Sequence, residues 1–553
     1  MCLMKKVALV CGLILSVVTI AACGNKGEEA KGSQVKVAKE GFPVVEEKIE
    51  LSMFAPNVGS TSYEKMAMMN DYSDKTNVFW KYTTPPDSDL ATKLNLAFAS
   101  GDIQEVLFAS RLSKVQEIQY GDNTLLPLDN YIDEGYAPNI KKILDEFPEL
   151  RNSLTTPDGH IYSLPMLSGK YNLEDEKFAK QTVFPSGPIW YNGKWLDKLG
   201  VKELPKTTDE FYDLLIRFRD EDPNGNGKKD EIPLSSAKID SLRPWMMWSF
   251  GVLQQEQQVM DGKVSYGAAT ENYRAYLAYM NKLYSEKLLD QEVFSQSDDQ
   301  KKSKGNNDRL GAFTDWFSFF TTNRTQEEAI NDPMFYPLSS PESPETVVSA
   351  TDGVATGAFA ITKKTANPEA AIRWVDYFYS NEGSRYFNAG PDEEKGGYWH
   401  WAKNDKGEEV RVRNEGITAD NAEEERSKIT PDYGTVTPKV SSEPVIILSD
   451  KNDSVEADAF QQFVNKETAE KIAPYEKIGW PTLYVSKEEQ DELGSSLQAD
   501  LLSYVQQMEA KFITGQEKLT DASWKTYLDT LDSIGVKKYV DVHQKAYDRW
   551  SKQ

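Results

Sequence analysis

A run of oxygen-bearing side chains separated by glycines occurs at residues 222–231, Asp-Pro-Asn-Gly-Asn-Gly-Lys-Lys-Asp-Glu. Oxygen donors at alternate positions of a tightly curled chain can converge on one hard cation such as Ca²⁺, and glycines supply the backbone angles that the curl needs. The spacing therefore predicts a calcium site, with a structural rather than a catalytic role. The competing interpretation is a solvated Gly-Asn turn that follows a helix.

Two registers of this loop satisfy the coordination chemistry. A loop that starts at Asp220 meets the general EF-hand pattern, but its ninth position is then a lysine, which would point a cation at the metal. A loop that starts at Asp222 places Gly227 at the sharp sixth position and an aspartate at the ninth. We favour the second register. Its predicted ligands are Asp222, Asn224, Asn226, the Lys228 carbonyl, Asp230 and Glu231.

Cys23 follows an N-terminal segment that has the layout of a secretory signal peptide. Lys5 and Lys6 precede an apolar run over residues 7–22, which ends in small residues and is shorter than the roughly 20 residues of a membrane-spanning helix. The sequence Ile20-Ala-Ala-Cys resembles the bacterial lipobox, in which the cysteine thiol is lipidated and becomes the new N-terminus. The alternatives are an uncleaved anchor or an ordinary signal peptide with a stray cysteine.

We therefore expect residues 1–22 to be a signal peptide and residues 23–45 to be a lipid-anchored flexible tether, rich in Gly, Lys, Glu and Ser. Two or more acyl chains, such as palmitate, would give stable membrane anchoring. The remaining cysteines, Cys2 and Cys11, lie in the signal peptide, so no disulfide is predicted in the folded body. The expected location is extracytoplasmic, on the cell membrane, and thus at the cell surface of a Gram-positive organism.

The composition of the 553-residue chain is acidic, with 87 Asp and Glu against 63 Lys and Arg and a formal net charge of −24. This balance argues against nucleic acid as a partner, because nucleic-acid binders need a basic surplus to displace phosphate counterions. The three histidines, His160, His400 and His543, are too scattered for a His-rich zinc site or a His-based triad. Catalysis would thus rest on a pair of carboxylates, as in a glycoside hydrolase, and no motif indicates such a pair.

The first predicted elements are a strand, a helix and a strand. Apolar and polar residues alternate over residues 49–54, and an amphipathic helix is predicted over residues 89–100 with Gly101 as its stop. A short apolar strand follows at residues 105–109. This order is a βαβ unit, so the sequence predicts an α/β fold whose sheet is parallel at its start.

Two later helices are marked by their first residues. Thr207 and Glu210 are spaced as a capping box, and the helix that they start leads the chain into the loop at 222–231. Asn367 and Pro368 are the preferred cap and first helical residue of another helix.

With these pieces in order, the sequence resembles the extracellular solute-binding proteins of bacterial carbohydrate ABC importers, particularly the larger lipoproteins grouped with alginate-binding and oligosaccharide-binding members. The most specific match is the loop at 222–231, where related proteins hold calcium in the Asp222 register. The chain departs from many relatives at Gln104-Glu105, where they have Pro-Asp. Besides the lipobox and this loop, the matching segments are residues 97–102, 158–165, 195–200, 206–207, 367–378 and 512–515.

The resemblance implies an α/β, two-lobed periplasmic-binding-protein-like fold with a hinge, an interlobe cleft and a helical C-terminal part. The chain crosses between the lobes, so each lobe is discontinuous. We expect residues 46–163 plus 345–405 to form the N-terminal lobe, and residues 164–344 plus 406–553 to form the C-terminal lobe with the calcium loop.

The resemblance also implies the function. The expected protein is a monomeric, non-catalytic substrate-binding component of an ABC transporter, which captures an oligosaccharide in the cleft and delivers it to permease subunits in the membrane. Two alternatives remain at this point: the same fold binding a peptide or another solute, and a surface glycoside hydrolase.

The expected sugar site combines flat aromatic platforms with a few polar side chains, because sugars present apolar C–H faces and hydroxyl rims. Trp316 ends a strand-like run at residues 310–316, and ligands collect at strand ends in α/β sheets. Arg111 follows an early strand and would suit a uronic acid carboxylate. Core packing is the competing role for every aromatic candidate. The predicted ligand-binding residues are Trp316, Trp399, Trp401, Trp245, Trp248, Arg111, Ser110 and Asn57.

Overall fold

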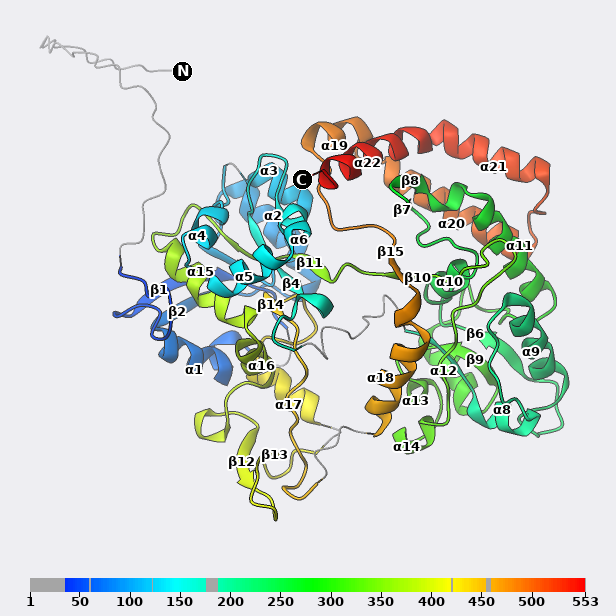
Figure 1. Cartoon of the computed structure of the whole chain (residues 1–553), viewed down its shortest axis with the longest axis horizontal. Helices are drawn as coiled ribbons and strands as arrows, with labels where there is room; N and C mark the ends of the chain where they lie inside the picture. Colours follow the sequence, from blue (N-terminus) through cyan, green and yellow to red (C-terminus); the bar gives the residue numbers. More distant parts are fainter. Residues whose placement is uncertain are drawn as a thin grey trace, which may run out of the picture.

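The computed structural model of the chain has two lobes, which lie side by side in Figure 1 and are joined at the top and in the middle of that view. The predicted signal peptide, Cys23 and the first part of the tether lie outside the described residues. Within the part of the chain that is described, no helix is both long and apolar enough to cross a membrane. The structure describes residues 35–58, 61–121, 123–175, 187–418, 421–453 and 459–552.

The first lobe is built on a six-stranded sheet with the strand order β14-β4-β11-β3-β1-β2. β1 (Ile49–Phe54) pairs in parallel with β2 (Val78–Thr83) and with β3 (Val106–Phe108), which confirms the predicted parallel start of the sheet. β11 (Val354–Ile361) runs antiparallel to β3 and to β4 (Ser163–Leu167).

Helices cover both faces of this sheet, because successive strand residues point to opposite sides. Val106 and Phe108 join one hydrophobic core, and Leu107 between them joins another. The predicted helix over 89–100 packs its Leu94 into the second of these cores. The helices of the first lobe are α1 (Ala67–Thr76), α2 (Leu90–Ser100), α3 (Lys114–Tyr120), α4 (Asp129–Asp133), α5 (Pro138–Glu146), α6 (Pro148–Leu154), α15 (Pro368–Asp376), α16 (Asn381–Ala389) and α17 (Ala422–Ile429).

The boundaries between the lobes differ from those that we predicted. β4 pairs with β11, and β14 (Lys439–Val440) pairs in parallel with β4, so both belong to the first sheet. The hairpin of β12 (Trp399–Lys403) and β13 (Glu409–Arg413) lies below the same lobe in Figure 1. Residues 164–175, 406–418 and 421–453 are therefore part of the first lobe. A two-residue strand such as β14 carries no periodic pattern, so the sequence does not reveal its partner.

The second lobe is built on the three-stranded sheet β5-β9-β6. β9 (Leu310–Thr314) runs parallel to β6 (Ile232–Ser235) and antiparallel to β5 (Ile189–Tyr191). Most of its helices, including the C-terminal ones, share one large hydrophobic core with this sheet, to which α12 contributes no residue. The helices of this lobe are α8 (Gly193–Leu199), α9 (Thr208–Asp220), α10 (Ile239–Trp248), α11 (Glu271–Ser285), α12 (Asp298–Asn306), α13 (Ser318–Thr321), α14 (Gln326–Ala329), α18 (Ala459–Lys471), α19 (Lys487–Leu493), α20 (Leu497–Thr514), α21 (Asp521–Ile534) and α22 (Val536–Trp550).

The remaining strands are short pairs, of which one joins the lobes. β10 (Val348–Ala350) pairs in parallel with β15 (Glu476–Ile478), so two chain segments pass between the lobes side by side. β7 (Gln257–Met260) and β8 (Lys263–Tyr266) form a hairpin in the second lobe. The β10–β15 pair occupies the middle joint in Figure 1.

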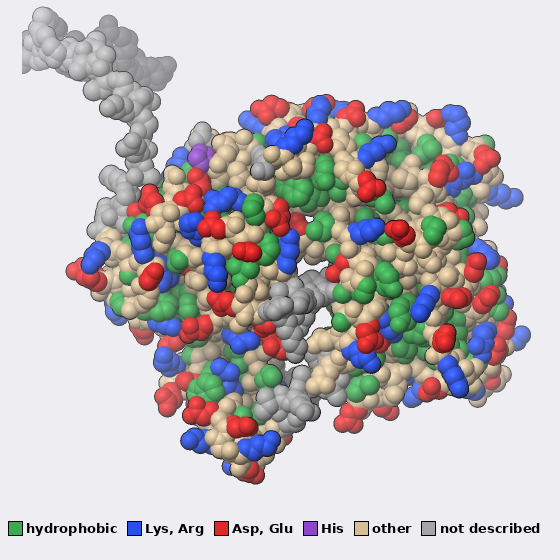
Figure 2. Space-filling model, viewed as in Figure 1, with side chains coloured by type: hydrophobic (Ala, Val, Ile, Leu, Met, Phe, Trp, Pro, Cys, Tyr) green, Lys and Arg blue, Asp and Glu red, His purple; other side chains and the backbone are tan. Residues whose placement is uncertain are grey.

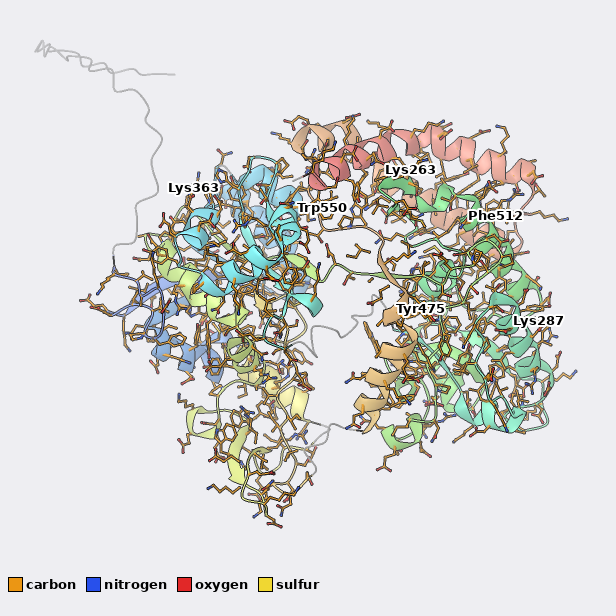
Figure 3. All side chains as sticks on the ribbon, in the orientation of Figure 1. Lys263, Lys287, Lys363, Tyr475, Phe512 and Trp550 are labelled. Carbon is orange, nitrogen blue, oxygen red and sulfur yellow. The ribbon has the colours of Figure 1, made fainter. Side chains whose placement is uncertain are left out.

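The upper joint is made by the C-terminal helices. The Trp550 indole at the end of α22 donates to the Ser153 hydroxyl of α6 in the first lobe at 3.1 Å, and Figure 3 shows Trp550 between the two lobes. Lys114 of α3 donates to the Leu483 carbonyl at 2.8 Å, in the segment that leads to α19. The second lobe is thus fixed to the first by its own last helices.

Candidate functional site

Trp316 lies on the side of the second lobe that faces the first. The helix that follows it, α13, lies beside α18 at the edge of the second lobe toward the first lobe in Figure 1. A side chain at Gly187 would lie 2.5 Å from the Asp315 carbonyl carbon, and the Phe460 ring packs 5.4 Å from the Phe317 ring. Trp316 is 56% exposed, and Figure 2 shows a hollow between the two lobes. The exposed indole is therefore available for contact with a ligand.

The backbone of Trp316 is held by its neighbour Asp315, which our sequence reasoning missed although it directly precedes the tryptophan. One carboxylate oxygen of Asp315 accepts the Trp316 backbone N–H at 2.8 Å. The other accepts from the Lys301 ammonium at 3.0 Å and from the Thr321 hydroxyl at 2.6 Å. Lys301 also donates to the Thr314 carbonyl at 2.8 Å, so the end of β9 and the turn after it are fixed together.

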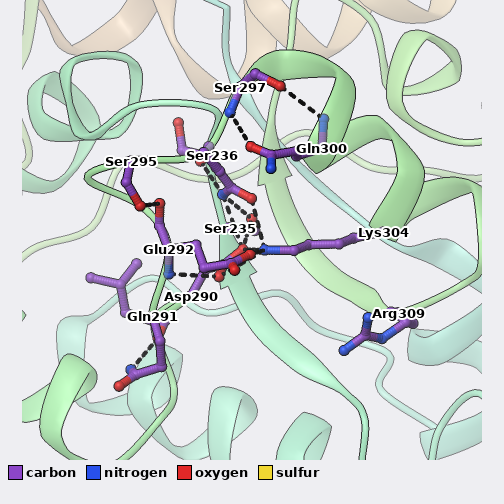
Figure 4. Close-up of polar contacts among 12 residues, drawn as sticks. Ser235, Ser236, Asp290, Gln291, Glu292, Ser295, Ser297, Gln300, Lys304 and Arg309 are labelled. Atoms are coloured by element: carbon purple, nitrogen blue, oxygen red, sulfur yellow. Dashed lines mark hydrogen bonds and ion pairs between the residues drawn. The ribbon is translucent and has the colours of Figure 1, made fainter.

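A second polar network fixes the end of β6 beside the end of β9 (Figure 4). The Asp290 carboxylate accepts from Ser235 at 2.6 Å and from Lys304 at 2.9 Å. Burial raises the pKa of Asp290, but these hydrogen bonds outweigh burial and hold that pKa below its usual range. The next residue, Ser236, shares a 2.7 Å hydrogen bond with the Thr314 hydroxyl. The platform at Trp316 is thus supported by buried, fully paired polar groups.

Trp245 and Trp248, which we predicted to be ligand-binding residues, are core residues in the structure. Their exposed fractions are 1% and 2%, and their rings pack edge to face at 4.8 Å in the core of the second lobe. Each indole N–H is paired with a backbone carbonyl, of Gly187 and Leu253 respectively. In this arrangement neither ring offers a face to a ligand, because α10 is buried on most of its circumference.

Trp399 and Trp401 lie in the β12–β13 hairpin of the first lobe, in the other lobe from Trp316. Trp399 is buried at 6% exposure and donates to the Ala389 carbonyl, whereas Trp401 is 49% exposed. The Arg411 guanidinium lies 4.4 Å from the centre of the Trp401 ring. The structure therefore does not bring the predicted tryptophans into one cluster.

The early polar candidates lie after β1 and β3 of the first lobe. Asn57 is exposed, whereas Ser110 is buried at 2% exposure and donates to the Gly357 carbonyl at 3.3 Å. Arg111 forms an ion pair with Asp87. Its backbone φ is +51°, in the left-handed region that non-glycine residues rarely adopt and that is enriched at functional sites.

The loop at 222–231 follows α9, whose predicted capping box is present. Thr207 accepts the backbone N–H of Glu210 at 3.2 Å, and the Glu210 carboxylate accepts the N–H of Thr207 at 3.1 Å. At the other end of the helix, the Asp220 carboxylate pairs with Arg219 at 2.8 Å. Asp222 instead accepts the backbone N–H of Gly227 at 3.2 Å, across the curl of the loop.

The side chains of this loop fit a cation. Glu231 has a buried carboxylate oxygen without a hydrogen-bond partner among the described residues. Burial, together with the negative charges of Asp222 and Asp230, raises the pKa of Glu231. The amide of Asn226 donates to the Asp230 carboxylate at 3.0 Å, and rotation of that amide would present its oxygen instead.

The carboxylates of the loop are not gathered at metal-binding distance. Among the described residues, no three or more His, Cys, Asp or Glu side chains lie close enough together to hold a metal ion. The arrangement therefore has the donors and the charge imbalance of a cation site, and the amides of Asn224 and Asn226 face Asp230 where a cation would lie.

Comparison with known proteins assigns the family. The profile of the bacterial extracellular solute-binding proteins matches residues 55–385, more than half of the chain. The chain belongs to this family. Its members bind solutes, so the family agrees with a two-lobed receptor and gives no support to a hydrolase.

Individual relatives are similar over nearly the full length. The fructooligosaccharide ABC transporter substrate-binding protein FusA of Streptococcus pneumoniae is 28% identical over 558 residues, which cover 97% of each chain. The structure of FusA in complex with kestose has a TM-score of 0.66 at 25% identity, and covers 91% of this chain and 100% of that one. A FusA EF-hand mutant in complex with fructo-nystose has a TM-score of 0.68 at 24% identity, with coverage of 91% and 100%.

Proposed function

We propose that this solute-binding protein captures a short oligosaccharide of the fructooligosaccharide type between its lobes and delivers it to the permease of an ABC transporter. The observation that carries the proposal is the similarity to FusA over 97% of both chains. The exposed Trp316 on the inner side of the second lobe supports it, because an indole face packs well on the apolar face of a sugar ring. Asn57 and Arg111 of the first lobe would supply hydrogen bonds.

In this proposal, the ligand is held by both lobes. The sugar stacks on Trp316, and closure of the first lobe brings its polar strand ends onto the sugar hydroxyls. Hinge closure of this kind buries a ligand between two half-sites, and the closed state is the one that a permease can recognise.

The loop at 222–231 would hold a structural Ca²⁺ ion through Asp222, Asn224, Asn226, the Lys228 carbonyl, Asp230 and Glu231. The unpartnered Glu231 oxygen and the accumulated negative charge support this proposal, as does the pairing of Asp220 with Arg219 instead of with the loop. The ion would neutralise these carboxylates and tie the end of α9 to β6. That the similar protein FusA has an EF-hand is consistent with it.

The N-terminal segment supports a lipid anchor at Cys23, which would keep the receptor at the outer face of the membrane near its permease. The sequence Ile20-Ala-Ala-Cys and the apolar run before it carry this part of the proposal. Mass spectrometry of the N-terminal peptide from the native host tests it. A diacylglyceryl group on Cys23 is expected, and an unmodified or absent cysteine would contradict the anchor.

The function itself is tested by calorimetric titration of residues 24–553 with kestose, nystose, maltotriose and a set of short peptides. Saturable binding of the fructooligosaccharides is expected, with weaker binding of maltotriose. Binding of peptides but of no oligosaccharide would overturn the proposal. The titrated sugars should also be recovered intact by mass spectrometry, since cleavage would identify an enzyme.

A further inference from the structure

A second pocket lies wholly within the first lobe, between α1, α16 and the β12–β13 hairpin. It has a volume of about 560 Å³, within the range of small-molecule sites. The residues that line it lie at 71–75, 174, 377–411 and 445, all in the first lobe. A ligand in this pocket therefore needs no closure of the lobes, unlike a ligand between them.

Arg411 is the central basic residue of this pocket. Its guanidinium lies 4.4 Å from the Trp401 ring centre and 5.1 Å from that of Trp399, in cation–π contact with both indoles. Its Nε atom is buried and has no hydrogen-bond partner among the described residues. Burial, together with the positive charge of Arg385, lowers the pKa of Arg411. The group is thus ordered by the indoles but not neutralised.

Arg385 lines the same pocket, and its guanidinium is paired only in part. Its Nη2 atom forms ion pairs with Asp175 and Glu443 at 3.5 and 4.0 Å, whereas its buried Nε atom lacks a hydrogen-bond partner among the described residues. Two guanidinium groups that face one pocket repel each other, and an oxyanion between them would relieve that repulsion and accept from both unpaired N–H groups.

One carboxylate that lines the pocket, Asp71, is paired with two other lining residues. Asp71 pairs with Lys395 at 2.8 Å and accepts from the Tyr386 hydroxyl at 2.6 Å. By contrast, Asn381 and Asp392 each have a buried side-chain oxygen without a partner among the described residues. Such acceptors would be satisfied by the hydroxyl groups of a ligand.

We propose that this pocket binds an oxyanion carried on a sugar ring, that is, a sugar acid or a sugar phosphate. Arg411 and Arg385 take the oxyanion, and the free oxygens of Asn381 and Asp392 accept sugar hydroxyls. The Trp399 indole lines the same pocket and offers an apolar surface to the ring. The site is independent of the proposed oligosaccharide site, because no residue of the second lobe contributes to it.

The test is a calorimetric titration of residues 24–553 with four probes: glucose, glucuronate, glucose 6-phosphate and inorganic phosphate. The first three share one ring and differ only in the anionic group, so they separate the carboxylate from the phosphate source. Binding of glucuronate or glucose 6-phosphate is expected, with no detectable binding of glucose. Binding of neither anionic sugar would overturn the proposal. Equal affinity for inorganic phosphate and glucose 6-phosphate would overturn the assignment to a sugar.

Arg411→Gln is the variant that tests the residue, with Arg413→Gln as its matched control on the same strand. Arg413 donates to the Ser449 hydroxyl and does not line the pocket. Arg411→Gln should weaken the anionic sugar about tenfold or more, because the charge-assisted hydrogen bonds are lost. Arg413→Gln should leave its affinity unchanged. Equal affinities in the two variants would overturn the role of Arg411.

A titration of the same variants with kestose separates this proposal from the function proposed above. Kestose affinity should be the same in Arg411→Gln and in the parent protein, because the two sites lie in different places. If Arg411→Gln unfolds, Arg385→Gln gives the same comparison from α16, outside the hairpin. If the parent protein bound the anionic sugar but not kestose, only the oligosaccharide function would be contradicted. If it bound kestose but not the anionic sugar, only the proposal for this pocket would be contradicted.

Discussion

At the scale of single residues, Trp316 combines an exposed side chain with a backbone that is held by hydrogen bonds. Its indole is 56% exposed, yet its backbone N–H is held by Asp315, which Lys301 and Thr321 hold in turn. An exposed aromatic ring on buried polar supports is preorganised for contact, because little conformational freedom is lost when a ligand stacks on it.

The substitution Trp316→Ala should weaken kestose binding about tenfold or more while changing the free energy of unfolding by less than about 0.5 kcal/mol. The stacking surface is lost, but little buried surface is. Calorimetry measures the first quantity and urea denaturation the second.

Trp245→Ala is the contrasting control, since that ring is 1% exposed. It should reduce stability by about 3–5 kcal/mol through the cavity that it leaves. A large loss of stability in Trp316→Ala, with unchanged kestose affinity, would instead make Trp316 a packing residue.

A single residue, Glu231, also provides the test of the calcium proposal. Its buried oxygen has no partner among the described residues, and Asp222 and Asp230 repel its charge. The melting temperature should therefore rise by several degrees when Ca²⁺ replaces a chelator, because a ligand that binds only the folded state at a hundred times its dissociation constant adds about 2.7 kcal/mol. Differential scanning calorimetry measures this shift.

Glu231→Gln should lose most of that shift, whereas Asp220→Asn should keep it. Asp220 pairs with Arg219, so it is the matched acidic control two residues before the first proposed ligand. An equal loss in both variants would favour the loop register that starts at Asp220, and a calcium shift retained in Glu231→Gln would contradict the proposed ligand set.

At the scale of elements, the joint between α3 and the segment before α19 contains a buried carboxylate. Glu117 of α3 accepts from the Tyr484 hydroxyl at 2.6 Å and from Ser163 at 2.9 Å, with none of its surface exposed. Burial raises the pKa of Glu117 to about 7. The two hydrogen bonds and the positive charge of Lys114 lower this pKa, but burial has the larger effect. The contact between the second lobe's last segments and the first lobe therefore depends on a titrating group.

The sign of this dependence follows from proton uptake. Between pH 4.5 and about 7, the folded protein keeps a proton on Glu117 that the unfolded chain has lost, so the stability that this group contributes falls as the pH rises through that window. Above about pH 7 the cost is constant, on the order of 3 kcal/mol. Glu117→Gln should remove this part of the pH slope in urea denaturation between pH 5 and 8.

Tyr484→Phe provides the second variant for this joint. It removes a hydrogen bond that lowers the pKa of Glu117, so the window of falling stability should move to higher pH. If both variants kept the parent slope over pH 5 to 8, Glu117 would not be the group that titrates there.

The elements that the sequence predicted are those with local signals. The strand at Ile49–Phe54, the helix that stops at Gly101 and the capping box at Thr207 depend on neighbouring residues, and the structure has all three. The burial of Trp245 depends on which helices pack around α10, and the partner of β14 on a sheet built from distant segments. Such tertiary contacts leave no periodic pattern in one sequence.

The candidate site divides in the same way. The exposed position of Trp316 could be predicted, because an apolar strand of five residues ends just before it. Its role in ligand binding stays a prediction that rests on the tendency of ligands to bind at strand ends in α/β sheets. The pocket around Arg411 could not be predicted from the sequence. It is formed by α1 together with α16 and the β12–β13 hairpin, and α1 lies more than 300 residues before both of them in the chain. Only the fold brings Asp71 beside Lys395.

At the scale of the whole molecule, the two lobes are joined along one side. The C-terminal helices contact α6 through Trp550 and α3 through Leu483, and the β10–β15 pair crosses in the middle. α14 of the second lobe and the β12–β13 hairpin of the first lie on the opposite side in Figure 1, away from these joints, and we call this the open side. This asymmetry predicts that closure is a rotation about the joined side, with the largest movement at the open side.

Paired spin labels test this rotation, because all three cysteines lie at or before Cys23 and residues 24–553 therefore carry none. One pair at Lys403 and Glu327 spans the open side, and a second pair at Glu146 and Lys545 spans the joined side. Saturating kestose should shorten the distance of the first pair markedly and leave the second nearly unchanged, as read by pulsed electron paramagnetic resonance. Equal shortening of both pairs would indicate translation rather than rotation. No change in either pair, under conditions where calorimetry shows kestose bound, would mean that this receptor holds its sugar without closing.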